Sequence, residues 1–182
     1  KVEYMAESSQ ALAAGATSIN IGIINTSKAI DAMNARLSTV DVKTKTAELT
    51  KLVDADKKLK ANLETMQTAL TAQKNSATDE QLKATLTQQI EMNKQTIALL
   101  EQNISANEQS IELLKSVGTA QTTVASIKEG LDGKGTKEDP GLKVGANSLD
   151  KNLTALAKGL DAMNTKSDEL VAGTSELSTK SV

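Results

Sequence analysis

The clearest hydrophobic pattern of the chain lies between residues 86 and 114, where inward positions alternate at spacings of four and three. One position of the repeat is always isoleucine, and the other alternates leucine with asparagine: Leu86, Ile90, Asn93, Ile97, Leu100, Ile104, Asn107, Ile111 and Leu114. A period of seven held over four repeats is typical of a coiled-coil seam, because the apolar stripe of an ordinary globular helix is wider and drifts. Asn93 and Asn107 are candidates for fixing the register of this seam.

A second periodic segment precedes it, and the two together predict a hairpin. Within residues 42–73 one position of the repeat holds Val42, Leu49, Leu63 and Leu70, and the other holds Leu52, Leu59 and Met66. Asp56 interrupts this seam. The polar connector between the two segments carries Thr78 and, three residues later, Gln81, which is a capping-box pattern. We therefore predict antiparallel helices over 42–75 and 78–117.

The pattern changes near Gly118, and we expect a further short helix over 119–131. The glycine-rich stretch 130–141, which contains the only proline, predicts a loop. A helix over 142–180 follows, in which one position recurs every seven residues: Leu142, Leu149, Leu156, Met163, Leu170 and Leu177. The position four residues later begins as Ala146, Leu153 and Leu160 and then becomes polar.

The two ends of the chain carry copies of one repeat, most visible as AIDAMN at 29–34 and GLDAMN at 159–164. A shift of 130 residues aligns about 33 residues without a gap, with Leu12 on Leu142 and Ile19 on Leu149. This match predicts a helix over 8–40. The stretch SINIGIIN (18–25) also alternates as a strand would, so a strand there stays open.

Both copies place glycine three residues after a large aliphatic residue. Glycine inside a helix costs about 1 kcal/mol relative to alanine, so its recurrence on one phase suggests close approach of another backbone. We expect the two repeat helices to lie antiparallel, with the following residues as packing candidates: Leu12, Gly15, Ile19, Gly22, Met33, Gly145, Leu149, Leu156, Gly159, Met163, Leu170 and Gly173.

Composition supports helices throughout. Tyr4 is the only aromatic residue and Pro140 the only proline, so the chain lacks the large side chains of a compact core and has few helix breakers. The predicted fold is all-α: a single elongated domain over 1–182, built as an antiparallel coiled-coil hairpin whose N- and C-terminal helices pair at the base of a rod.

The same composition disfavours catalytic and nucleic-acid-binding classes. The chain has no histidine and no cysteine, and hence neither the commonest general base nor a thiol nucleophile. The loop acids Asp132, Glu138 and Asp139 lack the ligand spacing of a calcium loop, so a solvated loop is the favoured interpretation. Charges are mixed, with a net charge of −2, and no basic block is present. We expect no enzyme activity, no cofactor, no metal and no nucleic-acid partner.

The stretch GLKVGANSLDKNLTALAKGLDAMNTKSDELVAGTSELS resembles the repeats of the phage-infection-protein (YhgE/Pip) family, and QALAAGATSINIGIINTSKAIDAMN resembles them more faintly. Asn152 and Lys166 depart from the pattern, and 42–117 shows no family hallmark. The resemblance implies an extracytoplasmic segment of a bacterial membrane protein, mostly of Gram-positive species. Some of its relatives are phage receptors, and the related EsaA-type proteins are accessories of type VII secretion.

These observations favour a non-enzymatic cell-surface segment used for binding or assembly, anchored in the membrane by parts outside the 182 residues. Its partner would be a phage protein, a secretion component or another copy of itself. Two alternatives stay open: a helical component or targeting region of a type VII secretion system, and a sensor or signalling coiled coil. A sensor would need a pocket with convergent polar groups.

Overall fold

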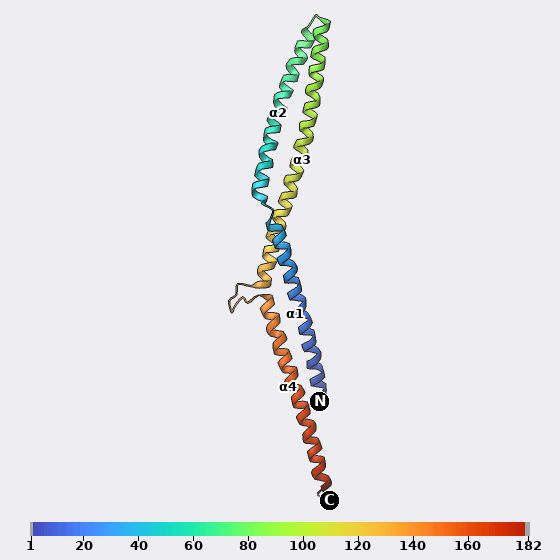
Figure 1. Cartoon of the computed structure of the whole chain (residues 1–182), viewed down its shortest axis with the longest axis vertical. Helices are drawn as coiled ribbons and strands as arrows, with labels where there is room; N and C mark the ends of the chain where they lie inside the picture. The colour runs from blue at the N-terminus through green and yellow to red at the C-terminus, as the bar shows by residue number, and fades with distance from the viewer. Residues whose placement is uncertain (1, 181–182) are drawn as a thin grey trace. The chain divides into compact units, whose positions relative to one another are not determined.

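The computed structural model describes residues 2–180. Within them it contains four α-helices and no strand, namely α1 (Val2–Ser38), α2 (Val42–Ser76), α3 (Glu80–Asp132) and α4 (Gly141–Lys180) (Figure 1). The all-α prediction is confirmed, and the alternative of a strand over 18–25 is wrong because these residues lie inside α1. Contacts group the described residues into two compact units, with 37–122 in one and the remainder in the other. The predicted single domain stays a prediction.

The unit of residues 37–122 is the predicted hairpin, in which α2 and the first part of α3 lie antiparallel (Figure 1). Its seam on α3 is the predicted one. Leu86, Ile90, Asn93, Leu100 and Ile104 are buried, and the other four positions of the pattern are half-buried. A strict seven-residue period thus located the α3 face correctly.

The seam of α2 differs from the prediction in one of its two positions. Leu49, Leu63 and Leu70 lie in the seam as expected. Leu52, Leu59 and Met66 are instead about half exposed, at 53%, 47% and 47%. The second seam position is filled by Thr46, Val53, Lys60, Gln67 and Lys74. Lys60 can take the place of leucine because its long stem packs along the seam while its ammonium reaches Glu101 at the edge, whereas the amide oxygen of Gln67 is buried without a hydrogen-bond partner.

Both helices of the hairpin begin at aspartate caps. The Asp41 carboxylate accepts a hydrogen bond from the Thr44 backbone N–H (3.0 Å), and this bond lowers the pKa of Asp41. The Asp79 carboxylate accepts one from the Leu82 N–H (2.8 Å). The predicted start of the second helix at Thr78 is therefore wrong by two residues. Aspartate serves as the cap because its charge also complements the helix dipole.

The predicted separate helix over 119–131 is also wrong, because α3 continues unbroken from Glu80 to Asp132. One glycine costs too little to end a helix without a proline. Gly118 is near Val42, whose side chain lies 3.4 Å from where a Cβ would stand. The Gln121 side-chain amide donates to the Leu37 and Val40 carbonyls (2.7 and 2.9 Å), which satisfies acceptors at the end of α1. The change of phase near Gly118 thus reflects a change in what α3 packs against.

In the other unit, α1 and α4 lie side by side and antiparallel (Figure 1). The Gln10 amide donates to Asp161 (3.4 Å), and the Thr17 hydroxyl donates to Asp150. The residue number of the α4 partner therefore decreases as the residue number on α1 increases, which is the mark of an antiparallel pair. The predicted pairing of the terminal helices is confirmed. The end of α3 joins this unit through Val124 and Leu131, which are both buried.

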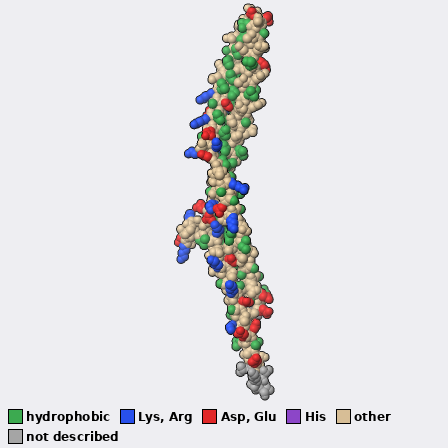
Figure 2. All heavy atoms as spheres, viewed as in Figure 1, with side chains coloured by type: hydrophobic (Ala, Val, Ile, Leu, Met, Phe, Trp, Pro, Cys, Tyr) green, Lys and Arg blue, Asp and Glu red, His purple; other side chains and the backbone are tan. Residues whose placement is uncertain are grey.

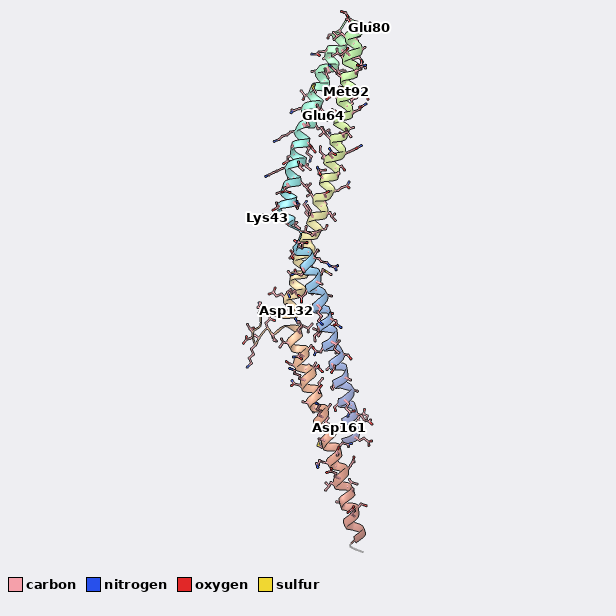
Figure 3. All side chains as sticks on the ribbon, in the orientation of Figure 1. Lys43, Glu64, Glu80, Met92, Asp132 and Asp161 are labelled. Atoms are coloured by element: carbon pink, nitrogen blue, oxygen red, sulfur yellow. The ribbon has the colours of Figure 1, made fainter. Side chains whose placement is uncertain are left out.

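The loop between α3 and α4 is shorter than predicted, covering residues 133–140, because 130–132 are helical. Gly133 and Gly141 close its base with φ of 68° and 77°, and a Cβ on Gly133 would stand 2.2 Å from the Gly141 nitrogen. Only glycine fits such an approach. Asp132, labelled in Figure 3, accepts from Lys128 (2.6 Å) and Lys143 (2.9 Å), and Lys128 also reaches Asp31 (2.6 Å).

Candidate functional site

The predicted packing residues of α1 and α4 do not face the α1–α4 seam. The seven large side chains are between 48% and 69% exposed: Leu12, Ile19, Met33, Leu149, Leu156, Met163 and Leu170. A Cβ added to any of the five glycines would meet no heavy atom within 4 Å: Gly15, Gly22, Gly145, Gly159 and Gly173. The expectation that these glycines bring α1 and α4 together is therefore wrong.

The seam that does join α1 and α4 lies one residue further along each helix and is built mainly of small and polar side chains. On α1 it is formed by Ala6, Ser9, Ala13, Ala16, Asn20, Ile23 and Ser27, and the same stripe continues as Ile30 and Asn34 where Asp31 pairs with Lys128 of α3. On α4 it is formed by Lys143, Ala146, Asp150, Leu153, Ala157, Leu160, Asn164 and Ser167. Alanine and serine fill it because they let two helix backbones approach closely, which is the role that the prediction gave to glycine.

One hydrogen bond shows how the two repeat copies are related in space. Asn20 donates from its amide to the Asp150 carboxylate (3.1 Å), and these residues occupy the same position of the repeat, 130 apart. An approximate two-fold axis therefore passes between them. A two-fold rotation that exchanges two antiparallel helices must have its axis perpendicular to the plane that contains both helices. Equivalent residues of α1 and α4 consequently lie on the same side of that plane.

The exposed repeat residues thus form one continuous surface, which we call the α1–α4 apolar face. Its members are Met5, Leu12, Gly15, Ile19, Gly22, Met33, Leu142, Gly145, Leu149, Leu156, Gly159, Met163, Leu170 and Gly173. Figure 2 shows hydrophobic side chains, in green, reaching the surface along this unit. On each helix the face follows a stripe of positions spaced alternately by three and four residues. The stripe positions from Met5 to Met33 on α1 and from Leu142 to Met163 on α4 include no charged residue.

The hairpin has an apolar surface of the same kind, the α2–α3 apolar face. It consists of Leu52, Leu59, Met66, Met92, Leu99 and Leu113, which are 47% to 68% exposed. Met66 and Met92 line one shallow groove together with Leu63 and Leu70, so residues from both helices meet on this side. Met92 is labelled in Figure 3.

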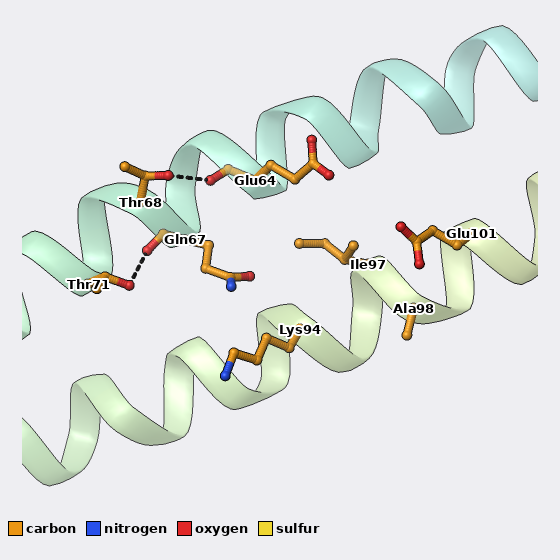
Figure 4. Close-up of a pocket in the computed structure, with 8 residues that line it drawn as sticks. All are labelled: Glu64, Gln67, Thr68, Thr71, Lys94, Ile97, Ala98 and Glu101. Atoms are coloured by element: carbon orange, nitrogen blue, oxygen red, sulfur yellow. Dashed lines mark hydrogen bonds between the residues drawn. The ribbon is translucent and has the colours of Figure 1, made fainter.

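The opposite edge of the hairpin is charged. Lys57 pairs with Glu108 (2.8 Å), and Lys60 pairs with Glu101 (2.9 Å), which raises the pKa of Lys60. A neighbouring groove, drawn in Figure 4, is lined from both helices by polar and charged residues that include Glu64, Lys94 and Glu101. Each exposed ion pair contributes little stability. These pairs do, however, give the hairpin one charged and one apolar side.

The two asparagines predicted to set register lie in the α2–α3 seam. Asn93 is 6% exposed, and its amide donates to the Leu63 carbonyl (2.7 Å), while its own amide oxygen has no partner. Asn107 is half-buried. A bond from α3 to one particular α2 carbonyl favours one alignment of the helices. The register-setting role itself stays a prediction.

The sequence predicted Ala146, Leu153 and Leu160 as one position of the α4 seam, and they lie in it, but the alanine and serine stripe of α1 and the Asn20–Asp150 contact were missed. A signal for both was present, because Ala6, Ala13 and Asn20 recur every seven residues, and so do Lys143, Asp150 and Ala157. The larger residues beside them form the stronger hydrophobic pattern and so predict the wrong seam. The repeat therefore identified which helices pair, but two neighbouring stripes on each helix stayed candidates for the buried seam.

Among residues 2–180, no group of three or more acidic residues lies close enough together to hold a metal ion. The described helices also include none with the length and apolarity needed to cross a bilayer. No protein-family model, curated protein or solved structure matches the chain.

Proposed function

We propose that the chain is a non-enzymatic binding or assembly segment of a bacterial cell-surface protein. The observation that carries the proposal is the imbalance between exposed and buried hydrophobic side chains. Large apolar residues are exposed at 22 described positions, whereas only Val53, Leu86, Ile90, Leu100, Ile104, Val124 and Leu131 are large and buried. Exposed apolar surface of this extent is typical of a protein–protein interaction site.

The arrangement of these residues also supports a protein partner. Each unit concentrates apolar side chains on a face beside its seam, and hairpin ion pairs occupy the other edge. Depletion of charge at the centre of a surface is the compositional signature of a protein interface. A catalytic role has less support, because the chain contains neither histidine nor cysteine.

The location at the cell surface rests on the resemblance of the α4 sequence to phage-infection-protein repeats. A single cysteine tests it, since none of the 182 residues is cysteine. Thr78→Cys places a thiol in the exposed connector before the Asp79 cap and leaves that cap intact. In the intact parent protein, with any other cysteines replaced, we expect a membrane-impermeant maleimide to label whole cells.

Labelling of Thr78→Cys only after the cells are permeabilised would contradict the surface location. Asn93→Cys provides the matched control, because this buried position should stay unlabelled in both conditions while the hairpin is folded. Two further measurements separate the partner classes. Loss of phage adsorption in a chain lacking the α2–α3 apolar face would identify a receptor. Recovery of small helical secretion proteins in a pull-down from labelled cells would favour the secretion alternative.

A further inference from the structure

We infer that the α1–α4 apolar face binds the same face of a second copy of this chain, so that two helix pairs form a four-helix bundle. The inference rests on the proposed function and names one of its partners. Its starting point is that the face borders the α1–α4 seam directly, displaced by one residue on each helix. A second layer of helices would therefore extend an existing helix interface.

The profile of the face is complementary to itself. Glycine fills several of the positions between the large residues that recur on the face, as in Leu142, Gly145, Leu149 on α4 and Leu12, Gly15, Ile19 on α1. Open space surrounds each of these glycines in the single chain. When two such faces meet, the leucines of one copy fit over the glycines of the other. Glycine inside a helix lowers stability relative to alanine. Close approach of a second copy, which a Cβ would hinder, explains why glycine is present at these positions.

The size of the face suits a stable dimer. From Leu142 to Leu170 it is about 40 Å long at about 1.5 Å per residue, and two helices of about 10 Å each make it about 20 Å wide. The resulting footprint of about 800 Å² matches what one partner contributes to a standard stable interface. The stripes 5–33 and 142–163 carry no charge, and Lys166 is the only charged residue that the α4 stripe adds as far as Leu170, so like-charge repulsion between two copies is small. A strongly charged partner would find no complementary charge there.

Sedimentation of the 182-residue chain over a range of concentrations tests the inference. We expect a monomer–dimer equilibrium that Leu149→Glu with Leu156→Glu weakens by about 100-fold, since each glutamate would have to be buried in the interface. Ser148→Glu with Ala155→Glu is the matched control. It adds the same charges one residue away at exposed positions outside the face and should dimerise as the unaltered chain does.

Circular dichroism on both double variants checks that helix content is unchanged, so that any loss of dimer reports the face itself. A chain that stays monomeric at all concentrations would overturn the inference, and so would a dimer that withstands the two glutamates. Neither result bears on the surface labelling of Thr78→Cys. The failure of this inference is therefore distinguishable from the failure of the proposed function.

The methionines give a second, independent readout without any substitution. Met33 and Met163 lie on the α1–α4 apolar face, at 48% and 51% exposure, and Met66 and Met92 lie on the α2–α3 apolar face, at 47% and 64%. Peroxide oxidises an accessible thioether to the sulfoxide. We expect dimerisation to slow oxidation of Met33 and Met163 relative to Met66 and Met92. Protection of Met66 and Met92 alone would overturn the inference.

Discussion

At the residue scale, the most informative side chain is Asn93. A buried amide whose oxygen lacks a partner lowers stability, yet its bond to the Leu63 carbonyl selects one helix alignment. We therefore predict that asparagine at this seam position trades stability for register. The same physics explains why the neighbouring positions of the pattern are isoleucine and leucine, which supply apolar burial without a preferred partner.

Replacing Asn93 by leucine should raise the free energy of unfolding by about 1 kcal/mol, because it removes the unpaired buried amide oxygen and adds apolar burial. Urea denaturation followed by circular dichroism measures the change. Asn103→Leu is the control, since Asn103 is exposed on the same helix and reports only the change in helix propensity. A drop in stability for Asn93→Leu would show that the bond to Leu63 outweighs the unpaired oxygen.

Gly133 and Gly135 lie in one loop but need glycine for different reasons: a left-handed backbone at both, and a close backbone approach at Gly133 alone. Both have positive φ, at 68° and 69°, but a Cβ would stand within 2.6 Å of backbone atoms only at Gly133. Alanine at Gly135 should cost about 1 kcal/mol for the left-handed backbone alone. Alanine at Gly133 should cost clearly more, because the base of the loop must open as well. Thermal unfolding of the two variants makes the comparison, and equal losses would contradict it.

At the element scale, the sequence predicted which segments are helices better than it predicted which face each helix buries. The α3 seam was predicted fully because isoleucine and leucine recur at both of its positions, whereas the neighbouring stripe of Met92, Leu99 and Leu113 is apolar at only one. In α4, Leu149 and Leu156 lie one residue before Asp150 and Ala157. Both stripes keep the period of seven, and hydrophobicity favoured the larger residues. Only the identity of the neighbouring helix decides between them, and that is a tertiary property.

The junction of α3 with α4 depends on the charge of Asp132. Hydrogen bonds from Lys128 and Lys143 lower the pKa of Asp132 below its usual value, and the bonds of Lys128 to Asp132 and Asp31 raise the pKa of that ammonium. A carboxylate whose pKa is lower in the folded state stabilises the fold at pH values above its unfolded-state pKa. This stabilisation is lost as the pH falls through the folded-state pKa. The stabilisation should therefore be present at neutral pH and fade below about pH 4.

Asp132→Asn tests this dependence, because it keeps the shape of the side chain and removes its charge. We expect a lower thermal midpoint than that of the unaltered chain at pH 7, with the difference shrinking as the pH falls below about 4. Glu138→Gln removes an exposed loop carboxylate and serves as the control. A difference that stays constant from neutral to acidic pH would mean that the lost charge is not responsible.

At the scale of the whole molecule, each unit buries a narrow seam and exposes a broad apolar face. Even the most buried hydrophobic residues among those described, Ala6 and Val124, remain 4% exposed, which is the expected result when only a few helices pack together. Hydrophobic stabilisation scales with the apolar area removed from water, so a pair of helices leaves much of its available stabilisation unused until a further surface covers it. Stability and association should therefore be coupled in this chain.

The glycines of the α1–α4 apolar face allow this coupling to be measured. Gly145→Ala with Gly159→Ala should stabilise the monomer by about 1 kcal/mol per site, because alanine is the better helix former and meets no atom within 4 Å in the single chain. The same change should weaken dimerisation, because the added methyl groups occupy the notches that receive leucines. Gly130→Ala, also helical and open, should stabilise without affecting association. Thermal unfolding at low concentration and sedimentation at high concentration read the two effects separately, and a double variant that associates more tightly would show that close backbone approach is not what these glycines provide.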